Sequence, residues 1–133
     1  MSIDWEALAE AATEAAACAY APYSHFHVGA AGLTADGRVV TGCNVENASY
    51  GLGLCAECGM ISTLIRGGGG TLVAVATRLA DGRPVVPCGR CRQVLWEHRD
   101  RERGCLVDGD GTPRDLAELL PGAFGPEDLL DPA

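Results

Sequence analysis

Two Cys-x-x-Cys segments constrain this chain more than any other feature of its sequence. The first, "CAEC", runs from Cys55 to Cys58, and the second, "CGRC", runs from Cys88 to Cys91, with 29 residues between them. Two such pairs are typical of four thiolates that close around a structural zinc ion. The first pair also encloses Glu57, and a closed four-thiolate site has no use for an acid. The alternative is a zinc ion held by three cysteines, with one open position and a carboxylate beside it.

Four observations favour the open site. The gap between the pairs is wider than the about 15 to 20 residues usual in zinc ribbons. A domain of this length with a good apolar core has little need of a metal staple. Both pairs are expected to begin helices, whereas four-thiolate ribbon sites typically lie on hairpin turns. Finally, Glu57 would add a negative charge beside a zinc ion that four thiolates already make negative.

The open site has a chemical use. Three protein ligands leave the fourth tetrahedral position for water, which the metal makes more acidic. A carboxylate two residues after the first ligand, in the same helical turn, can reach that water and move its proton, and Glu57 is at that place. The order C-x-E, a long gap, then P-C-x-x-C is found in zinc deaminases of nucleobases and nucleosides. Two helix N-termini directed at the thiolates would each supply about half a positive charge.

Length, composition and charge limit the other possibilities. The 133 residues, 47% of them apolar, predict a single domain over residues 1–133. The net charge of −8 argues against a nucleic-acid partner, because phosphate binding needs clustered Lys and Arg. Neither a membrane-spanning run nor a basic signal peptide is recognisable, so we expect a cytoplasmic protein. In a reducing compartment, seven cysteines indicate metal binding or catalysis and not disulfides.

The order of predicted elements indicates an α/β layered domain with a mixed sheet covered by helices. The first helix is capped by Ser2 or Asp4 and ends before Pro22. Two strands then meet at an Asp36-Gly37 turn. The remaining elements are predicted as helices over 55–66, 89–98 and 115–120, and as strands within 71–79 and 104–111.

Five segments together resemble the small, homotetrameric cytidine deaminases of bacteria and animals. They are "PYSHFHVGAA", "GCNVENASYG", "CAEC", "PCGRCRQVL" and "LLPGAF", in the order of that family and spread over about residues 5–128. The resemblance implies a three-layer α/β/α domain with a five-stranded sheet and one zinc ion per chain. It also implies hydrolysis of cytidine or 2′-deoxycytidine to the uridine and ammonia, in pyrimidine salvage. The expected partners are a small nucleoside and further copies of the chain, with neither nucleic acid nor membrane.

The resemblance also implies roles for individual residues. Cys55, Cys88 and Cys91 match the zinc ligands, and Glu57 matches the proton shuttle. Asn44 and Glu46 match the pair that holds the ribose hydroxyls, and Val45 is the residue between them. Ala56 matches a backbone contact to the pyrimidine, Phe26 matches the phenylalanine that stacks on the base, and Tyr50 matches a residue lining the pocket. Phe124 matches a phenylalanine that reaches a neighbouring subunit's pocket.

One residue departs from the family pattern. Much of the family has an arginine where Cys58 stands, and that arginine bonds to the ligand thiolates. We hypothesise that Cys58 is a protonated thiol near the zinc ion but not bound to it. Two alternatives stay open: a deaminase of a cytosine-containing antibiotic such as blasticidin S, and, in a different class, a zinc-ribbon interaction module that binds metal without turnover.

Overall fold

A β-hairpin begins the sheet, and its turn is at the predicted place. The computed structural model describes residues 2–129. Strands β1 (Val28–Thr34) and β2 (Val39–Cys43) pair antiparallel. Gly37, between them, has a φ of 92°, a left-handed conformation that glycine adopts at little cost. The predicted Asp36-Gly37 turn is confirmed.

Three further strands complete a mixed sheet. The strongly apolar run predicted as a strand forms β3 (Leu72–Leu79), which is buried along almost its whole length and pairs antiparallel with β1. Strand β4 (Leu106–Asp108) runs parallel to β3, and the two-residue β5 (Arg114–Asp115) runs antiparallel to β4. The order across the sheet is β2-β1-β3-β4-β5.

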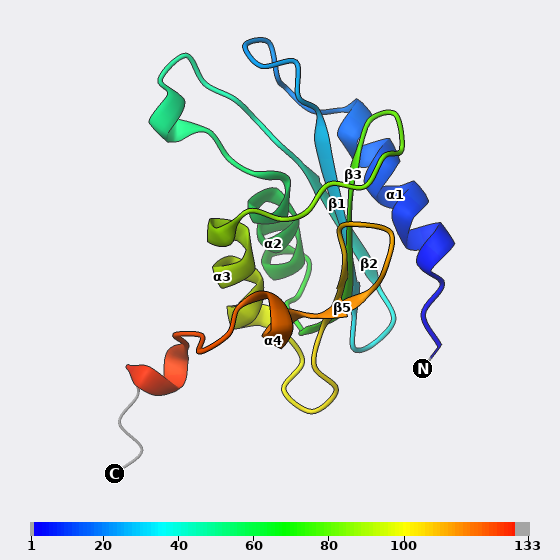
Figure 1. Ribbon diagram of the computed structural model, residues 1–133, viewed down its shortest axis with the longest axis vertical. Coiled ribbons are helices and arrows are strands. Elements are labelled where there is room, and N and C mark those ends of the chain that lie inside the picture. Colours follow the sequence, from blue (N-terminus) through cyan, green and yellow to red (C-terminus); the bar gives the residue numbers. More distant parts are fainter. Residues whose placement is uncertain (1, 130–133) are drawn as a thin grey trace.

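Helices cover both faces of this sheet, as Figure 1 shows. Helix α1 (Trp5–Ala17) packs on one face, where Leu8 and Ala12 join the small side chains of β1 and β3 in a core cluster. The other face carries α2 (Ala56–Arg66), α3 (Gly89–His98) and α4 (Leu116–Leu119), whose buried side chains share a second cluster. The predicted three-layer α/β/α architecture with a mixed five-stranded sheet is therefore confirmed.

Two glycines let the helices approach the sheet closely, one on each face. A Cβ atom at Gly29 would lie 1.9 Å from the carbonyl oxygen of Ala12 in α1. A Cβ atom at Gly42 would lie 2.2 Å from the backbone nitrogen of Met60 in α2. Both distances are far shorter than any van der Waals contact, so the helix positions depend on the missing side chains. For α2 this matters most, because Cys55 is its N-cap residue and its first turn carries Glu57.

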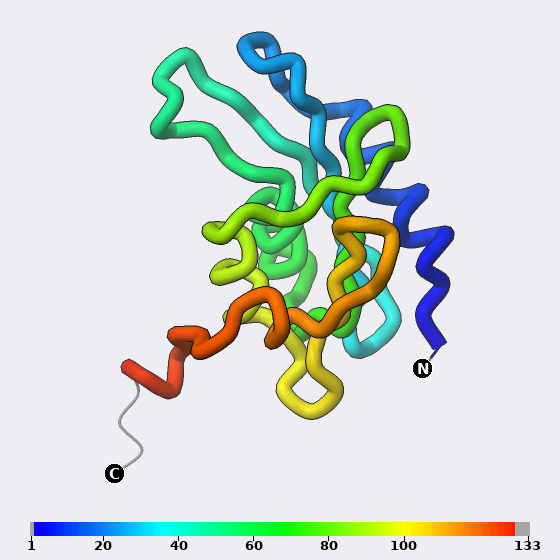
Figure 2. The backbone as a smooth tube through the Cα atoms, viewed as in Figure 1, coloured from blue at the N-terminus to red at the C-terminus, as the bar shows by residue number. Residues whose placement is uncertain are grey.

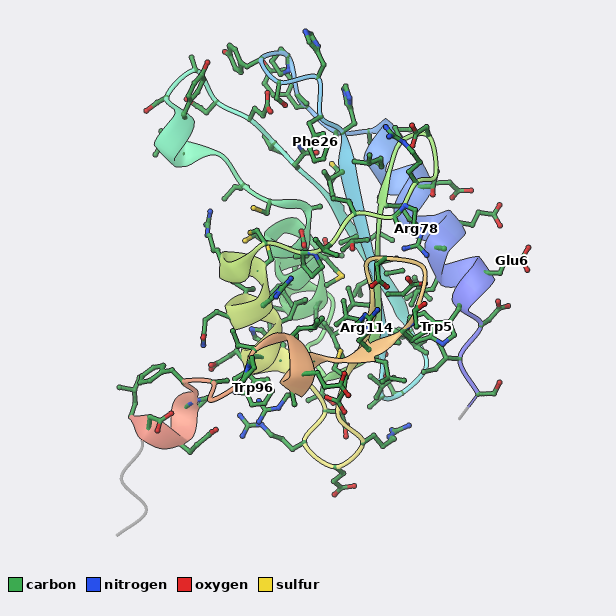
Figure 3. All side chains as sticks on the ribbon, in the orientation of Figure 1. Trp5, Glu6, Phe26, Arg78, Trp96 and Arg114 are labelled. Carbon is green, nitrogen blue, oxygen red and sulfur yellow. The ribbon has the colours of Figure 1, made fainter. Side chains whose placement is uncertain are left out.

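A buried ion pair connects β3 to the end of β4. Nη2 of Arg78 lies 2.8 Å from Oδ2 of Asp108, with side-chain exposures of 8% and 6%. The neighbouring Thr77 hydroxyl donates a hydrogen bond to the carbonyl of Val85, in the segment that leads to Cys88. Arg78, near the end of β3, is labelled in Figure 3. This part of the sheet therefore supports the loop before the second cysteine pair.

The structure corrects several details of the predicted elements. Strand β5 and a short 3₁₀ turn, Tyr50–Leu52, were not predicted, because each is only two or three residues long. Of the two predicted caps of the first helix, Asp4 is the one found, and α1 ends at Ala17, before Pro22 as predicted. The ends of the predicted domain, residues 1 and 130–133, lie outside the described residues. Within the described part of the chain, the helices are all too short or too polar to pass through a lipid bilayer.

Candidate active site

Two helices begin at the same place and bring three sulfur atoms together. Cys55 is the N-cap residue of α2 and Cys88 is that of α3, while Cys91 is buried in the first turn of α3. The three Sγ atoms all lie within 4.8 Å of one another. A tetrahedral zinc ion with Zn–S bonds of about 2.3 Å needs S···S separations of roughly 3.8 Å, so these residues fit the metal. Among residues 2–129, this cluster of possible ligands does not include Cys58.

The charges around the sulfurs also suit a bound cation. Burial is the main cause that raises the pKa of the Cys55 and Cys91 thiols, and the Glu57 charge raises both further. Burial works in the same direction at Cys88, but the backbone N–H and the thiol of Cys91 outweigh it, so the pKa of Cys88 is below its ordinary value. Three thiolates in this partly buried place therefore need a positive charge to be stable. A divalent ion and two helix N-termini would supply it.

Glu57 lies beside the sulfur cluster and is almost inaccessible to solvent. Its residue is 4% exposed, in the first turn of α2. Burial raises the pKa of the Glu57 carboxyl above its ordinary value, against a smaller opposing effect of backbone and Cys91 hydrogen bonds. A buried carboxyl group with a raised pKa, next to a candidate metal site, is suited to proton transfer.

The cysteines and Glu57 line a cleft of about 540 Å³. Small-molecule sites typically have volumes of roughly 300–1,000 Å³, so the cleft can hold a nucleoside. The structure brings most of the predicted substrate residues to its walls, namely Phe26, Asn44, Val45, Glu46, Tyr50 and Ala56. It also adds residues that the sequence did not single out: Tyr23, Ser24, Val28, Asn47, Gly53, Leu54, Val85 and Val86.

Asn44 and Glu46 bind the first residue of β1 and the chain segment that leads into it. Oδ1 of Asn44 accepts from the backbone N–H of Val28 at 2.8 Å, and its Nδ2 donates to the carbonyl of Phe26 at 2.8 Å. Oε1 of Glu46 accepts from the backbone N–H groups of Tyr23 and Ser24, at 3.0 and 3.1 Å. Figure 2 shows this segment and the loop after β2 at the same end of the sheet. The polar "NVEN" motif thus organises the wall of the cleft, which its residue types alone could not indicate.

Two predicted site residues lie apart from this cleft in the described chain. Phe124 is half exposed and belongs to the C-terminal segment that extends away from the sheet (Figure 1). Its carbonyl accepts a hydrogen bond of 2.8 Å from Nε2 of Gln93 in α3. Cys58 is partly buried and is not among the described residues that line the cleft. A single chain therefore leaves the Phe124 ring free for another contact.

Comparison with known proteins agrees with this geometry. Residues 2–106 match the sequence model of the cytidine and deoxycytidylate deaminase zinc-binding region. The cytidine deaminase of Mycobacterium tuberculosis is 58% identical over 127 residues, which cover 96% of this chain and 94% of that protein. The cytidine deaminase of Halalkalibacterium halodurans is 43% identical over 132 residues, covering 97% of this chain and 100% of that protein.

A solved structure shares both the fold and much of the sequence. The crystal structure of the Mycobacterium tuberculosis cytidine deaminase superposes with a TM-score of 0.88 and 57% identity, over 93% of this chain and 99% of that one. The family match spans more than half of the chain, and the identities to named relatives extend over nearly all of it. This chain is therefore a member of the cytidine and deoxycytidylate deaminase family.

Proposed function

We propose that this protein is a zinc-dependent cytidine deaminase that hydrolyses cytidine and 2′-deoxycytidine to uridine and 2′-deoxyuridine, with release of ammonia. One observation carries the proposal: three cysteine sulfurs within 4.8 Å of one another lie beside a buried glutamate in a nucleoside-sized cleft. The names of the relatives and the family match support the same reaction. We assign Cys55, Cys88 and Cys91 as the zinc ligands.

Zinc at the three sulfurs would supply the Lewis acid that makes water a good nucleophile near neutral pH. Glu57 is the group that moves protons. It takes a proton from the attacking water and gives it to N3 of the cytosine ring while the new C–O bond forms at C4. It then takes the remaining proton from the new C4 hydroxyl and passes it to the exocyclic nitrogen, which leaves as ammonia when the C–N bond breaks and the C4 carbonyl forms. The burial of Glu57 supports this role, because its raised pKa favours a carboxyl group that both accepts and donates.

The walls of the cleft support recognition of a nucleoside. Glu46 and Asn44 lie where a carboxylate and an amide can bind the hydroxyls of a ribose, and we assign them that role. Phe26 is half exposed at the cleft, as a ring that stacks on a base should be. The buried Ala56 and the exposed Val45 and Tyr50 line the same space.

The alternatives have less support. The relatives carry the name cytidine deaminase, which does not favour an antibiotic substrate such as blasticidin S. A four-cysteine interaction module needs Cys58 at the metal, whereas the cluster of ligand atoms found among the described residues holds three sulfurs. A comparison of cytidine with blasticidin S as substrates tests the first alternative directly.

We also infer a homotetramer that acts in pyrimidine salvage in the cytoplasm. Two observations support the assembly: Phe124 and Tyr50 expose large rings, and Phe124 does not reach the cleft of its own chain. All seven cysteines are free thiols, as expected in a reducing compartment. Light scattering of the purified protein measures the mass of the assembly, and a monomeric mass would contradict this inference.

An ultraviolet assay of cytidine loss, with zinc content measured on the same sample, tests the proposed function. We expect turnover of cytidine and 2′-deoxycytidine and about one zinc ion per chain. Removal of the metal with a chelator should abolish turnover, and added zinc should restore it. A protein that contains zinc but leaves both nucleosides unchanged would contradict the proposal.

A further inference from the structure

The side chain of Ser24 lies between the residue assigned to the sugar and the residue assigned to the base. Its hydroxyl donates a hydrogen bond to Oε2 of Glu46 and accepts one of 3.0 Å from the backbone N–H of Phe26. A serine hydroxyl has one proton to donate and two lone pairs that accept, so both bonds can exist together. One small side chain thus connects two residues that line the cleft.

Glu46 is held in a fixed orientation by this arrangement. Its Oε1 accepts from the backbone N–H groups of Tyr23 and Ser24, and its Oε2 accepts from the Ser24 hydroxyl. The Ser24 hydroxyl is the main cause that lowers the pKa of the Glu46 carboxyl, so the group stays ionised at neutral pH. A carboxylate offers about four acceptor positions. Its oxygens therefore keep capacity for a further donor from the cleft, such as a sugar hydroxyl.

Phe26 is held through its backbone on both sides. Its N–H donates to the Ser24 hydroxyl, and its carbonyl accepts from Nδ2 of Asn44 at 2.8 Å. Between Ser24 and Phe26, His25 has a φ of 58°, in the left-handed region that is unfavourable for a residue with a Cβ atom. Such a turn persists only where neighbouring contacts fix it. The hydrogen bond from the Phe26 N–H to the Ser24 hydroxyl spans His25, and the same hydroxyl is bound to Glu46. Figure 3 labels Phe26 at the end of this turn.

We propose that Ser24 is a positioning residue that couples recognition of the sugar to stacking of the base. Its hydroxyl holds the Glu46 carboxylate and the Phe26 backbone in one arrangement, so a substrate that engages Glu46 also meets a correctly placed Phe26 ring. This inference rests on the proposed function, because it takes Glu46 as the acceptor of a ribose hydroxyl. It adds a residue that contributes to recognition through its neighbours.

The test compares cytidine with 3′-deoxycytidine, which lacks the hydroxyl that Glu46 would accept from. In Ser24→Ala we expect the KM for cytidine to rise about tenfold, the size of one lost hydrogen bond to a charged group. The kcat should change little. For 3′-deoxycytidine, which lacks the hydroxyl that Glu46 would bind, the KM should rise by at most about threefold. Ser24→Thr keeps the hydroxyl and should retain the wild-type preference. Ser62→Ala, an exposed serine in α2, is the matched control.

Melting temperatures of all variants confirm that they are folded. Equal losses for the two substrates in Ser24→Ala would overturn the proposal, since a merely structural serine affects both alike. An unchanged cytidine KM would also overturn it, as would a Ser24→Thr variant that behaves like Ser24→Ala.

Glu46→Ala separates this inference from the proposed function. If Glu46 binds the sugar, this variant loses the preference for cytidine over 3′-deoxycytidine. If the wild-type protein shows no such preference, or deaminates neither nucleoside, the assigned role of Glu46 fails and the inference fails with it. If Glu46→Ala removes the preference and Ser24→Ala leaves it at the wild-type value, the role of Ser24 alone is wrong.

Discussion

At the scale of single residues, Glu57 combines two properties that no other acid of the cleft shares: it is buried, and it lies in the same helical turn that follows Cys55. Glu46, the other acid at the cleft, accepts hydrogen bonds from the Ser24 hydroxyl and from backbone donors, and these bonds lower its pKa. The pKa values of the two carboxyl groups are therefore shifted in opposite directions because their surroundings differ. The buried one is suited to transferring protons and the other to accepting hydrogen bonds as an anion.

Replacing Glu57 by glutamine keeps the shape of the side chain and removes its ability to carry a proton. We predict that Glu57→Gln lowers kcat by at least about 10²-fold, the lower end of what general acid–base catalysis contributes. The zinc content should stay the same, because Glu57 is not one of the three sulfur ligands. Glu97→Gln, on the exposed side of α3, is the control and should leave kcat unchanged. A Glu57→Gln enzyme with wild-type kcat would show that another group moves the proton.

Cys58 distinguishes the open site from a closed one. Its sulfur is not part of the ligand cluster found among the described residues. We predict that Cys58→Ser keeps both its zinc and its activity, whereas Cys91→Ser loses both. Metal analysis of the two purified variants decides. Loss of zinc from Cys58→Ser would mean that the fourth cysteine binds the metal.

At the scale of secondary-structure elements, the active site depends on how closely α2 approaches β2. The Gly42 backbone leaves no space for a methyl group against Met60, and Gly29 is equally tight against α1 on the opposite face. Of the two helices, only α2 carries site residues in its first turn. A methyl group at either glycine would therefore clash with a helix, but only at Gly42 does that helix carry site residues.

We predict that Gly42→Ala and Gly29→Ala each destabilise the protein by about 1–3 kcal/mol, the usual cost of overpacking. Only Gly42→Ala should also lower kcat and zinc content in the fraction that is folded, because it displaces Cys55 and Glu57. Denaturant unfolding measures the first effect, and assays well below the melting temperature measure the second. Equal losses of kcat in the two variants would show that activity does not depend specifically on the position of α2.

The elements that could be predicted from the sequence are those whose own residues form a recognisable strand, turn or helix pattern. The all-apolar β3 and the hairpin at Asp36-Gly37 are local signals, and both appear where they were predicted. β5 consists of Arg114 and Asp115, two polar residues that pair with β4 only because the chain returns there. No local pattern marks such a strand, so the sequence gives no reason to place it.

The same limit applies to the site. The motifs around Cys55, Cys88 and Cys91 indicated a shared metal site, because each motif and the gap between them can be read directly from the sequence. The position of Ser24 depends on a left-handed His25 and on a loop that begins after β2, and neither is visible in residue types. Val85 and Val86 reach the cleft because the sheet supports their loop.

At the scale of the whole molecule, the proposed homotetramer gives Phe124 a role that it does not have within one chain. Phe124 is half exposed and lies outside the cleft of its own chain within the described residues. If it enters a neighbour's cleft, Phe124→Ala should raise the KM for cytidine, by about tenfold for the loss of a stacked ring. Mixed oligomers with Glu57→Gln should recover part of the lost affinity, because a chain with Glu57 then receives an intact Phe124. Mixtures that give only the sum of the two separate activities would contradict this assembly.

The central claim is a metal centre with three sulfur ligands and one open position beside Glu57. X-ray absorption at the zinc edge of the purified enzyme measures the ligands directly. We predict three sulfurs at about 2.3 Å and one lighter oxygen ligand, with the same spectrum in Cys58→Ser. A shell of four sulfurs in the resting enzyme, reduced to three in Cys58→Ser, would contradict the claim.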